Sequence, residues 1–195
     1  MAFVDDGTGT GNKARVTSEK RLSTEAVASP IQHHISHNSE GAYQVSGEAT
    51  LAAATVSILH IENTSTDNDM IVSYIRLQIV GQTGGTAIPN TSNYFRVSTG
   101  RTYASGGALK APTNVHFGSP KTSEVSVYSS GATLAGTAIE IDRWYPTSDG
   151  DRITYTKEGS IIIPRGQTLE MSYIGDHTGG LAYARVSFFM QSRHV

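Results

Sequence analysis

Three closely spaced histidines near the N-terminus are the residues whose spacing most suggests chemistry. His33 and His37 stand four positions apart, and His34 adjoins the first of them. On a helix this spacing places two imidazoles on one face, as a metal site requires. The flanking proline, asparagine, serine and glycine disfavour a helix, and a third ligand would have to come from His60 or His116. We therefore predict a polar linker and no metal site, with a metal shared between symmetry-related copies as the alternative.

Patterns typical of catalysis are incomplete. The glycine-rich run before Lys13 resembles a phosphate-binding loop, but Ala14 stands where that motif needs serine or threonine. The sequence has no G-x-S-x-G elbow, and its acidic residues fall in predicted turns or at outward strand positions. These patterns predict no catalytic residues, no cofactor and no enzymatic activity.

One aromatic and basic cluster is a candidate contact surface. Arg143, the only tryptophan, Trp144, and Tyr145 follow one another at the end of a predicted strand. Such a cluster is typical of an interface hot spot or a sugar platform. The alternative is packing at the edge of the core, because large aromatic side chains are usually mostly buried.

Composition excludes several classes of protein. The chain has no cysteine, so disulfides and cysteine-based metal sites are excluded. Its net charge of −2 is scattered, unlike the basic footprint of a nucleic-acid-binding protein. No apolar run approaches the roughly 18–20 residues of a membrane-spanning helix. Acidic residues at the N-terminus are unlike a signal peptide, so we expect synthesis in a cytoplasm without export by the usual route.

Alternating apolar and polar residues predict strands throughout the chain after residue 41. In Leu181–Met190, for example, alternate residues are apolar, which is typical of a strand with one face on a core. The predicted strands are 42–49, 55–62, 70–80, 93–98, 114–117, 124–128, 138–145, 153–157, 160–173 with a turn at 164–166, and 181–190. Many short strands separated by turns predict an all-β protein, a β-sandwich. A jelly roll is the favoured connectivity and an immunoglobulin-like order is the alternative.

Two further features complete the predicted organisation. In residues 70–80, Ile71, Ile75, Leu77 and Ile79 are predicted to share one face. Residues 100–113 form the longest segment without a pattern, and loops of that length are often functional.

The first 45 residues differ from the rest and are predicted to form an extended N-terminal arm, with the β-sandwich body at 46–195. Ala14 and Val16 are predicted to face Leu22 and Thr24 in a short hairpin, and a short helix near residues 18–28 is the alternative. The arm cannot bury much apolar surface by itself, so we expect it to need a partner. Its candidate partner-binding residues are Phe3, Val4, Lys13, Arg15, Lys20, Arg21 and Leu22.

Both ends of the chain resemble structural proteins of tailed bacteriophages. The N-terminal "DDGTGTGNKARVTSEKRLSTEAV" is similar to the glycine- and threonine-rich starts of such proteins, which continue into a short hairpin. The C-terminal "IIIPRGQTLEMSY" and "ARVSFFM" are similar to the closing strands of phage β-sandwich virion proteins.

The resemblance implies a virion component assembled in the bacterial cytoplasm, most closely a capsid decoration (cement) or head accessory protein. The expected partners are the major capsid protein or other virion proteins, with no nucleic acid and no membrane. Such a subunit is expected to form a homotrimer or a dimer and to staple neighbouring capsomers through residues 1–45. The alternative is a neck, tail or head-fibre accessory protein that binds a receptor or a glycan.

Overall fold

The computed structural model describes residues 2–5, 13–16, 22–23 and 41–192, and the side chains of 41–156 and 160–192. Every regular element in these ranges is a strand, so the predicted all-β class is confirmed. Within the described residues, no helix is long and apolar enough to cross a membrane.

The strands divide into two units of the chain, residues 1–30 and 31–195. The first unit contains β1 (Ala2–Asp5), β2 (Lys13–Val16) and β3 (Leu22–Ser23). The second contains β4 (Ala42–Thr50), β5 (Thr55–Asn63), β6 (Asn68–Thr83), β7 (Tyr94–Thr99), β8 (Thr102–Ser105), β9 (Ala108–Lys110), β10 (Thr113–Asn114), β11 (Val125–Ser129), β12 (Thr133–Ala135), β13 (Ile139–Trp144), β14 (Arg152–Ile163), β15 (Thr168–Ile174) and β16 (Gly179–Ser192).

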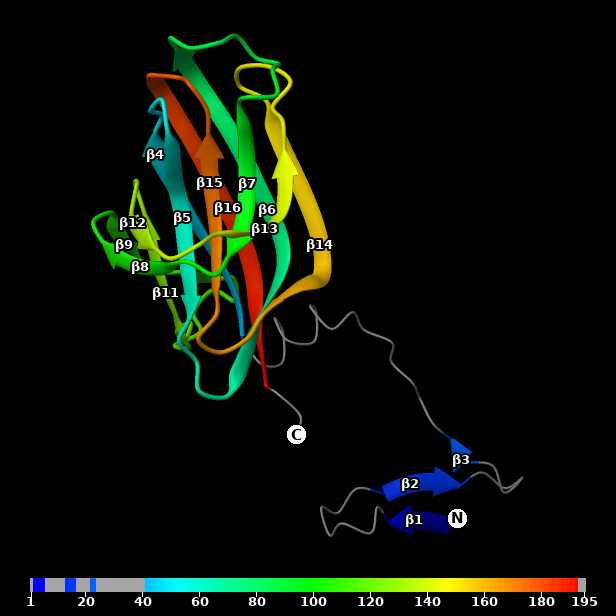
Figure 1. Ribbon diagram of the computed structural model, residues 1–195. Coiled ribbons are helices and arrows are strands. Elements are labelled where there is room, and N and C mark those ends of the chain that lie inside the picture. Colours follow the sequence, from blue (N-terminus) through cyan, green and yellow to red (C-terminus); the bar gives the residue numbers. More distant parts are fainter. Residues whose placement is uncertain (1, 6–12, 17–21, 24–40, 193–195) are drawn as a thin grey trace. The chain divides into compact units, whose positions relative to one another are not determined.

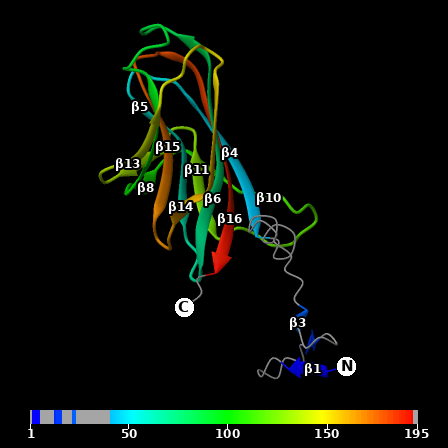
Figure 2. The same ribbon diagram turned by 90° about the vertical axis from the view of Figure 1, so that its right-hand side faces the viewer.

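Two antiparallel sheets form the body of the second unit and pack face to face. One has the strand order β10-β4-β16-β6-β14, and the other has the order β13-β7-β15-β5-β11-β9. Figure 2 shows the two layers from the side, with β4, β6 and β16 in one and β5, β13 and β15 in the other. The predicted β-sandwich is confirmed, while the jelly-roll connectivity stays a prediction.

Alternation along the closing strands builds the core between the two sheets. In β15, Leu169, Met171 and Tyr173 are fully buried, and in β16, Val186 and Phe188 point into the same core. Burial of such side chains contributes about 1.5–3 kcal/mol each. The period of two that is visible in the sequence therefore orients these strands.

A β-bulge at Ser73 corrects the face that we predicted for β6. Ser187 pairs with Tyr74 and Phe188 pairs with Val72, so Ser73 is the extra residue on β6. A bulge reverses which residues face inward. Val72 therefore joins the main core, whereas Ile71 packs on the other face with Phe189, away from Ile75 and the other apolar residues of β6.

Several strand boundaries also differ from the prediction. Segments 153–157 and 160–163 belong to one strand, β14, which crosses an irregularity between Thr156 and Ile161. The predicted strand at 114–117 is wrong beyond Asn114, because the chain turns there. Residues 100–113 are not a plain loop, since they contain β8 and β9.

A two-stranded ribbon of β8 and β12 crosses the outer face of the six-stranded sheet (Figure 1). Tyr103 of β8 stacks on Tyr128 of β11, with the ring centroids 3.6 Å apart and the planes nearly parallel. This stacking attaches the ribbon to the sheet. Thr168, Glu170 and Ser172 of β15, which alternation assigns to solvent, are buried.

The first unit is a three-stranded sheet with the order β1-β2-β3. The structure pairs Val16 with Leu22, which is the register of the predicted hairpin. It adds β1, which the prediction missed and which pairs Phe3 with Arg15. The predicted boundary between residues 45 and 46 falls within β4, the first strand of the sandwich.

Candidate functional site

The outer face of the five-stranded sheet carries two rows of polar side chains across four strands. The first row, from β4 to β14, is Ser46, Arg185, Arg76 and Thr154. The second row is Glu48, Tyr183, Gln78 and Arg152. Residues in the same row are cross-strand neighbours whose Cβ atoms lie about 4.5–5.5 Å apart. The pairing of the strands thus gathers three arginines from separate parts of the sequence.

Burial of the alternate residues fixes the outward direction of these side chains. Ile75 and Leu77, on either side of Arg76, are buried in the core, and so are Ala184 and Val186 on either side of Arg185. The guanidinium carbon of Arg76 lies 5.4 Å from the centre of the Tyr74 ring. Its Nε is buried without a hydrogen-bond partner among the described residues. The face therefore holds a partly desolvated cation beside a second one.

All of these side chains except Thr154 line a groove with a volume of about 370 Å³. The cationic residues on its walls are Arg76, Arg152, Arg185 and Lys110, and Glu48 is its one acidic residue. Among the side chains that the structure describes, no ion pair engages any of these four cations. The groove is a concave surface of positive charge, which suits an anionic ligand.

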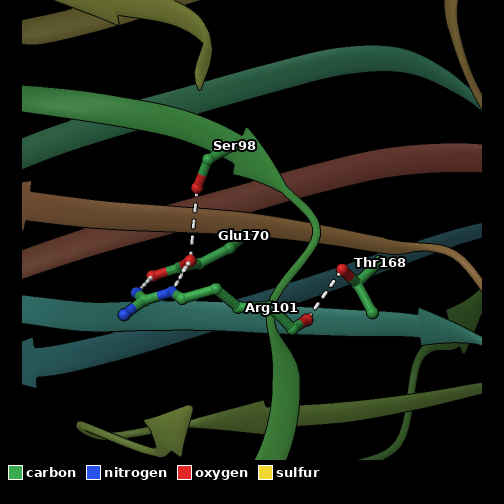
Figure 3. Close-up of polar contacts among 4 residues, drawn as sticks. All are labelled: Ser98, Arg101, Thr168 and Glu170. Atoms are coloured by element: carbon green, nitrogen blue, oxygen red, sulfur yellow. Dashed lines mark hydrogen bonds and ion pairs between the residues drawn. The ribbon is translucent and has the colours of Figure 1, made fainter. Parts of the chain in front are cut away.

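A buried ion pair on the opposite sheet has a structural role. Glu170 of β15 is 1% exposed and forms a two-pronged pair with Arg101, whose Nε lies 2.9 Å from Oε2 of Glu170. The Ser98 hydroxyl also donates to this carboxylate at 3.2 Å, and the Thr168 hydroxyl donates to the carbonyl oxygen of Arg101 at 2.9 Å. Figure 3 shows Arg101 reaching back to Glu170 from the segment that crosses the sheet after β7. The pair anchors the start of the β8–β12 ribbon.

His60 lies beside this pair, opposite Glu170 in the register of β5 and β15. It is fully buried, and neither ring nitrogen has a hydrogen-bond partner among the described residues. Burial lowers the pKa of His60 below 6.5. The negative charge of Glu170 partly opposes this decrease, and the positive charge of Arg101 adds to it. The ring of Tyr128 lies 6.5 Å from it. His60 is therefore a neutral, enclosed imidazole without access for a substrate.

The structure divides the predicted cluster of Arg143, Trp144 and Tyr145. Trp144 packs against the core, 4.8 Å from the ring of Tyr155, as the alternative interpretation expected. Arg143 pairs with Glu140 at 2.8 Å and lies 4.2 Å above the Tyr94 ring. The Arg143 charge is therefore already satisfied within the chain, and this cluster is a weaker candidate than the groove.

The predicted partner-binding residues of the first unit are placed only by their backbone. Phe3 and Val4 lie in β1, Lys13 and Arg15 in β2, and Leu22 in β3. Lys20 and Arg21 lie outside the described residues, and so do the three clustered histidines and most of the alternative helix. No group of three potential metal ligands occurs among the described residues.

Comparison with known proteins adds no relative: no protein-family model and no curated protein matches this chain.

Sequence reasoning missed the groove although a signal for it exists. Arg76 and Arg185 stand between inward-facing apolar residues, so alternation alone places both on outer faces. What alternation does not provide is the pairing of β6 with β16, strands that are far apart in the sequence. The shared surface becomes visible only once these strands are neighbours.

Proposed function

We propose that this chain is a non-enzymatic structural protein of a bacteriophage virion, a capsid decoration (cement) protein. The observation that carries the proposal is the division of the chain into a β-sandwich and a separate three-stranded unit. A separate small unit supports the idea of an attachment arm, because it can contact a neighbouring capsomer while the sandwich folds by itself. The likeness of both chain ends to phage virion proteins gives the proposal its class.

We interpret the sandwich as a jelly roll. Eight of its strands divide into the orders β4-β16-β6-β14 and β5-β15-β7-β13. In each sheet the last strand lies between the first two: β16 between β4 and β6, and β15 between β5 and β7. This is the arrangement of two consecutive Greek keys. Such a sandwich supports assembly through repeated contacts of a homotrimer or dimer, whose many weak contacts add up through effective concentration.

The attachment role is tested by deleting residues 2–40. The cut keeps Gly41, whose carbonyl accepts a hydrogen bond from the Met190 amide at 2.9 Å, and it leaves β4 intact. We expect a truncated protein with the β-rich circular dichroism spectrum and the thermal unfolding of an intact sandwich. It should no longer bind shells of the phage's capsid protein. Normal decoration by the truncated protein would contradict the proposal.

Charge reversal within the full chain provides a second test and a control. Lys13→Glu combined with Arg15→Glu changes β2 of the small unit, whereas Arg165→Glu changes an exposed turn of the sandwich. We expect only the first variant to lose affinity for the capsid shell. Light scattering after size exclusion measures the trimer or dimer in the same samples.

A second candidate function is that of a neck, tail or head-fibre accessory protein that binds a receptor or glycan. The arginine-lined groove favours it, because its cations have no ion-pair partner among the described side chains, and a concave charged face suits a ligand better than a closed contact with a flat shell. Binding of the protein to host cells, competed by isolated surface glycans, tests this candidate. Absence of cell binding would exclude it.

A further inference from the structure

The arginine-lined groove lies over the central strands β6 and β16 of the five-stranded sheet, and this position restricts what can bind in it. β16 pairs with β4 on one side and β6 on the other, and β6 pairs with β16 and β14. Their backbone amides and carbonyls are used by these ladders, so only side chains face the groove. An extended peptide therefore cannot add a strand to β6 or β16, the usual mode for peptides on sheets.

The arrangement of charges in the groove destabilises the folded protein, and an anionic ligand would offset that destabilisation. Arg76 and Arg185 are direct cross-strand partners, and like charges in such positions destabilise a sheet. The Nε of Arg76 is buried without a partner among the described residues, and a buried donor left unpaired also costs free energy. A carboxylate or phosphate between the two guanidinium groups would offset both costs through charge-assisted hydrogen bonds.

The remaining walls suit hydroxyl groups. Tyr183 lies between Glu48 and Gln78 in the second row, one row away from the arginine pair. Its ring offers an apolar surface, while Glu48 and Ser46 can accept hydrogen bonds from hydroxyls. A volume of about 370 Å³ is small for a macromolecular partner and lies near the lower end of the range for small-ligand sites.

We propose that this groove binds an anionic saccharide. The carboxylate or phosphate of the saccharide lies between Arg76 and Arg185. The sugar ring and its hydroxyls lie along Tyr183, Gln78 and Glu48. The proposal rests on the second candidate function, and it names the ligand class and the site. A nucleic acid fits less well, because the charge is confined to one groove of a chain whose net charge is −2.

The test uses the full chain and defined sugars. Oligogalacturonate and sialyllactose provide carboxylates, the methyl ester of oligogalacturonate is the uncharged match, and inorganic phosphate provides the anion alone. Binding is followed by titration calorimetry and by amide chemical shifts. We expect the acidic sugars to bind, the methyl ester not to bind, and the shifts of the wild-type protein to concentrate in β6 and β16.

Two variants locate the site. Arg76→Gln and Arg185→Gln should each weaken binding of the acidic sugar by about tenfold or more, the effect expected for loss of a charged hydrogen bond. Arg165→Gln removes the same charge from an exposed turn and should leave binding unchanged. Because the shift map is measured on the wild-type protein, the test does not depend on the variants folding.

Several outcomes would overturn the proposal. These are binding of no acidic sugar, equal binding of the methyl ester, equal binding of inorganic phosphate alone, tighter binding of an acidic peptide or an oligonucleotide, or binding unaffected by both groove variants. A negative result with the acidic sugars would exclude the saccharide site. It would not affect the proposed capsid role, because binding of the chain to capsid shells is measured separately.

Discussion

Arg76 and Arg185 are directly paired across the two central strands β6 and β16, and both lie on the outer face of the sheet. Two arginines in this relationship repel each other, and among the described side chains no acidic residue pairs with either. A protein selected only for stability has no need of this arrangement. The acidic group of the proposed saccharide would balance this repulsion.

Removing one charge of this pair should not destabilise the protein. For Arg185→Gln, we expect the free energy of unfolding at low salt to stay equal or to rise by about 0.2–1 kcal/mol, because a cross-strand repulsion is lost. The gain should shrink at high salt, where the charges are screened. Urea denaturation at both salt concentrations measures this, with Arg165→Gln as the control. A loss of stability would mean that Arg185 supports the fold.

The buried pair of Glu170 and Arg101 predicts an asymmetric response to mutation. Arg101→Ala leaves a carboxylate that is 1% exposed without its partner, whereas Glu170→Gln leaves an arginine that is 19% exposed and can reach water. We expect Arg101→Ala to lower the free energy of unfolding by about 3–5 kcal/mol and Glu170→Gln to lower it by less. Chemical denaturation of both variants tests the order, and the reverse order would contradict it.

The same pair should hold the β8–β12 ribbon in place. In Arg101→Ala, amide exchange in β8 should accelerate more than exchange in the sandwich core, because the anchor at the start of the ribbon is lost. A uniform acceleration would indicate global destabilisation instead.

His60 predicts a dependence of stability on pH. Because burial lowers its pKa in the folded state, the unfolded chain takes up the proton first as pH falls below 6.5. The free energy of unfolding should therefore decrease from that point towards the lowered pKa, and be fully retained above 6.5. The groups that face this imidazole are Glu170, Arg101 and Tyr128. In His60→Gln, the slope of stability against pH in this window should be shallower, and an unchanged slope would contradict the prediction.

Gly47 of β4 lies where the two sheets pack closely together. A Cβ at this position would lie 2.7 Å from the Cβ of Ser129 and 2.8 Å from the carbonyl oxygen of Ile58. We expect Gly47→Ala to lower the free energy of unfolding by about 1–3 kcal/mol through overpacking. Thr50→Ala, at an exposed position of the same strand, is the control, and thermal or urea unfolding is the measurement. No loss in Gly47→Ala would mean that β4 can move away.

Much of the sandwich could be predicted because its signals are local. Within β15, apolar Leu169, Met171 and Tyr173 alternate with polar residues in the sequence itself. Burial of these three side chains follows directly from that alternation. The face of Ile71 was predicted wrongly because the bulge at Ser73 depends on how β6 pairs with β16. The burial of Glu170 was not predictable either, since its partner Arg101 comes from the segment after β7, far away in the sequence.

The amino-acid sequence by itself determined the all-β class, the core-facing residues of most strands and the separateness of the N-terminal segment, because each depends on neighbours along the chain. Only the tertiary structure decided which outward residues share a surface. Arg76 and Arg185 are more than a hundred positions apart and meet because β16, the last strand, pairs with β6. Alternation fixes the face of a strand, but long-range hydrogen bonding fixes its neighbour, and the groove depends on that neighbour.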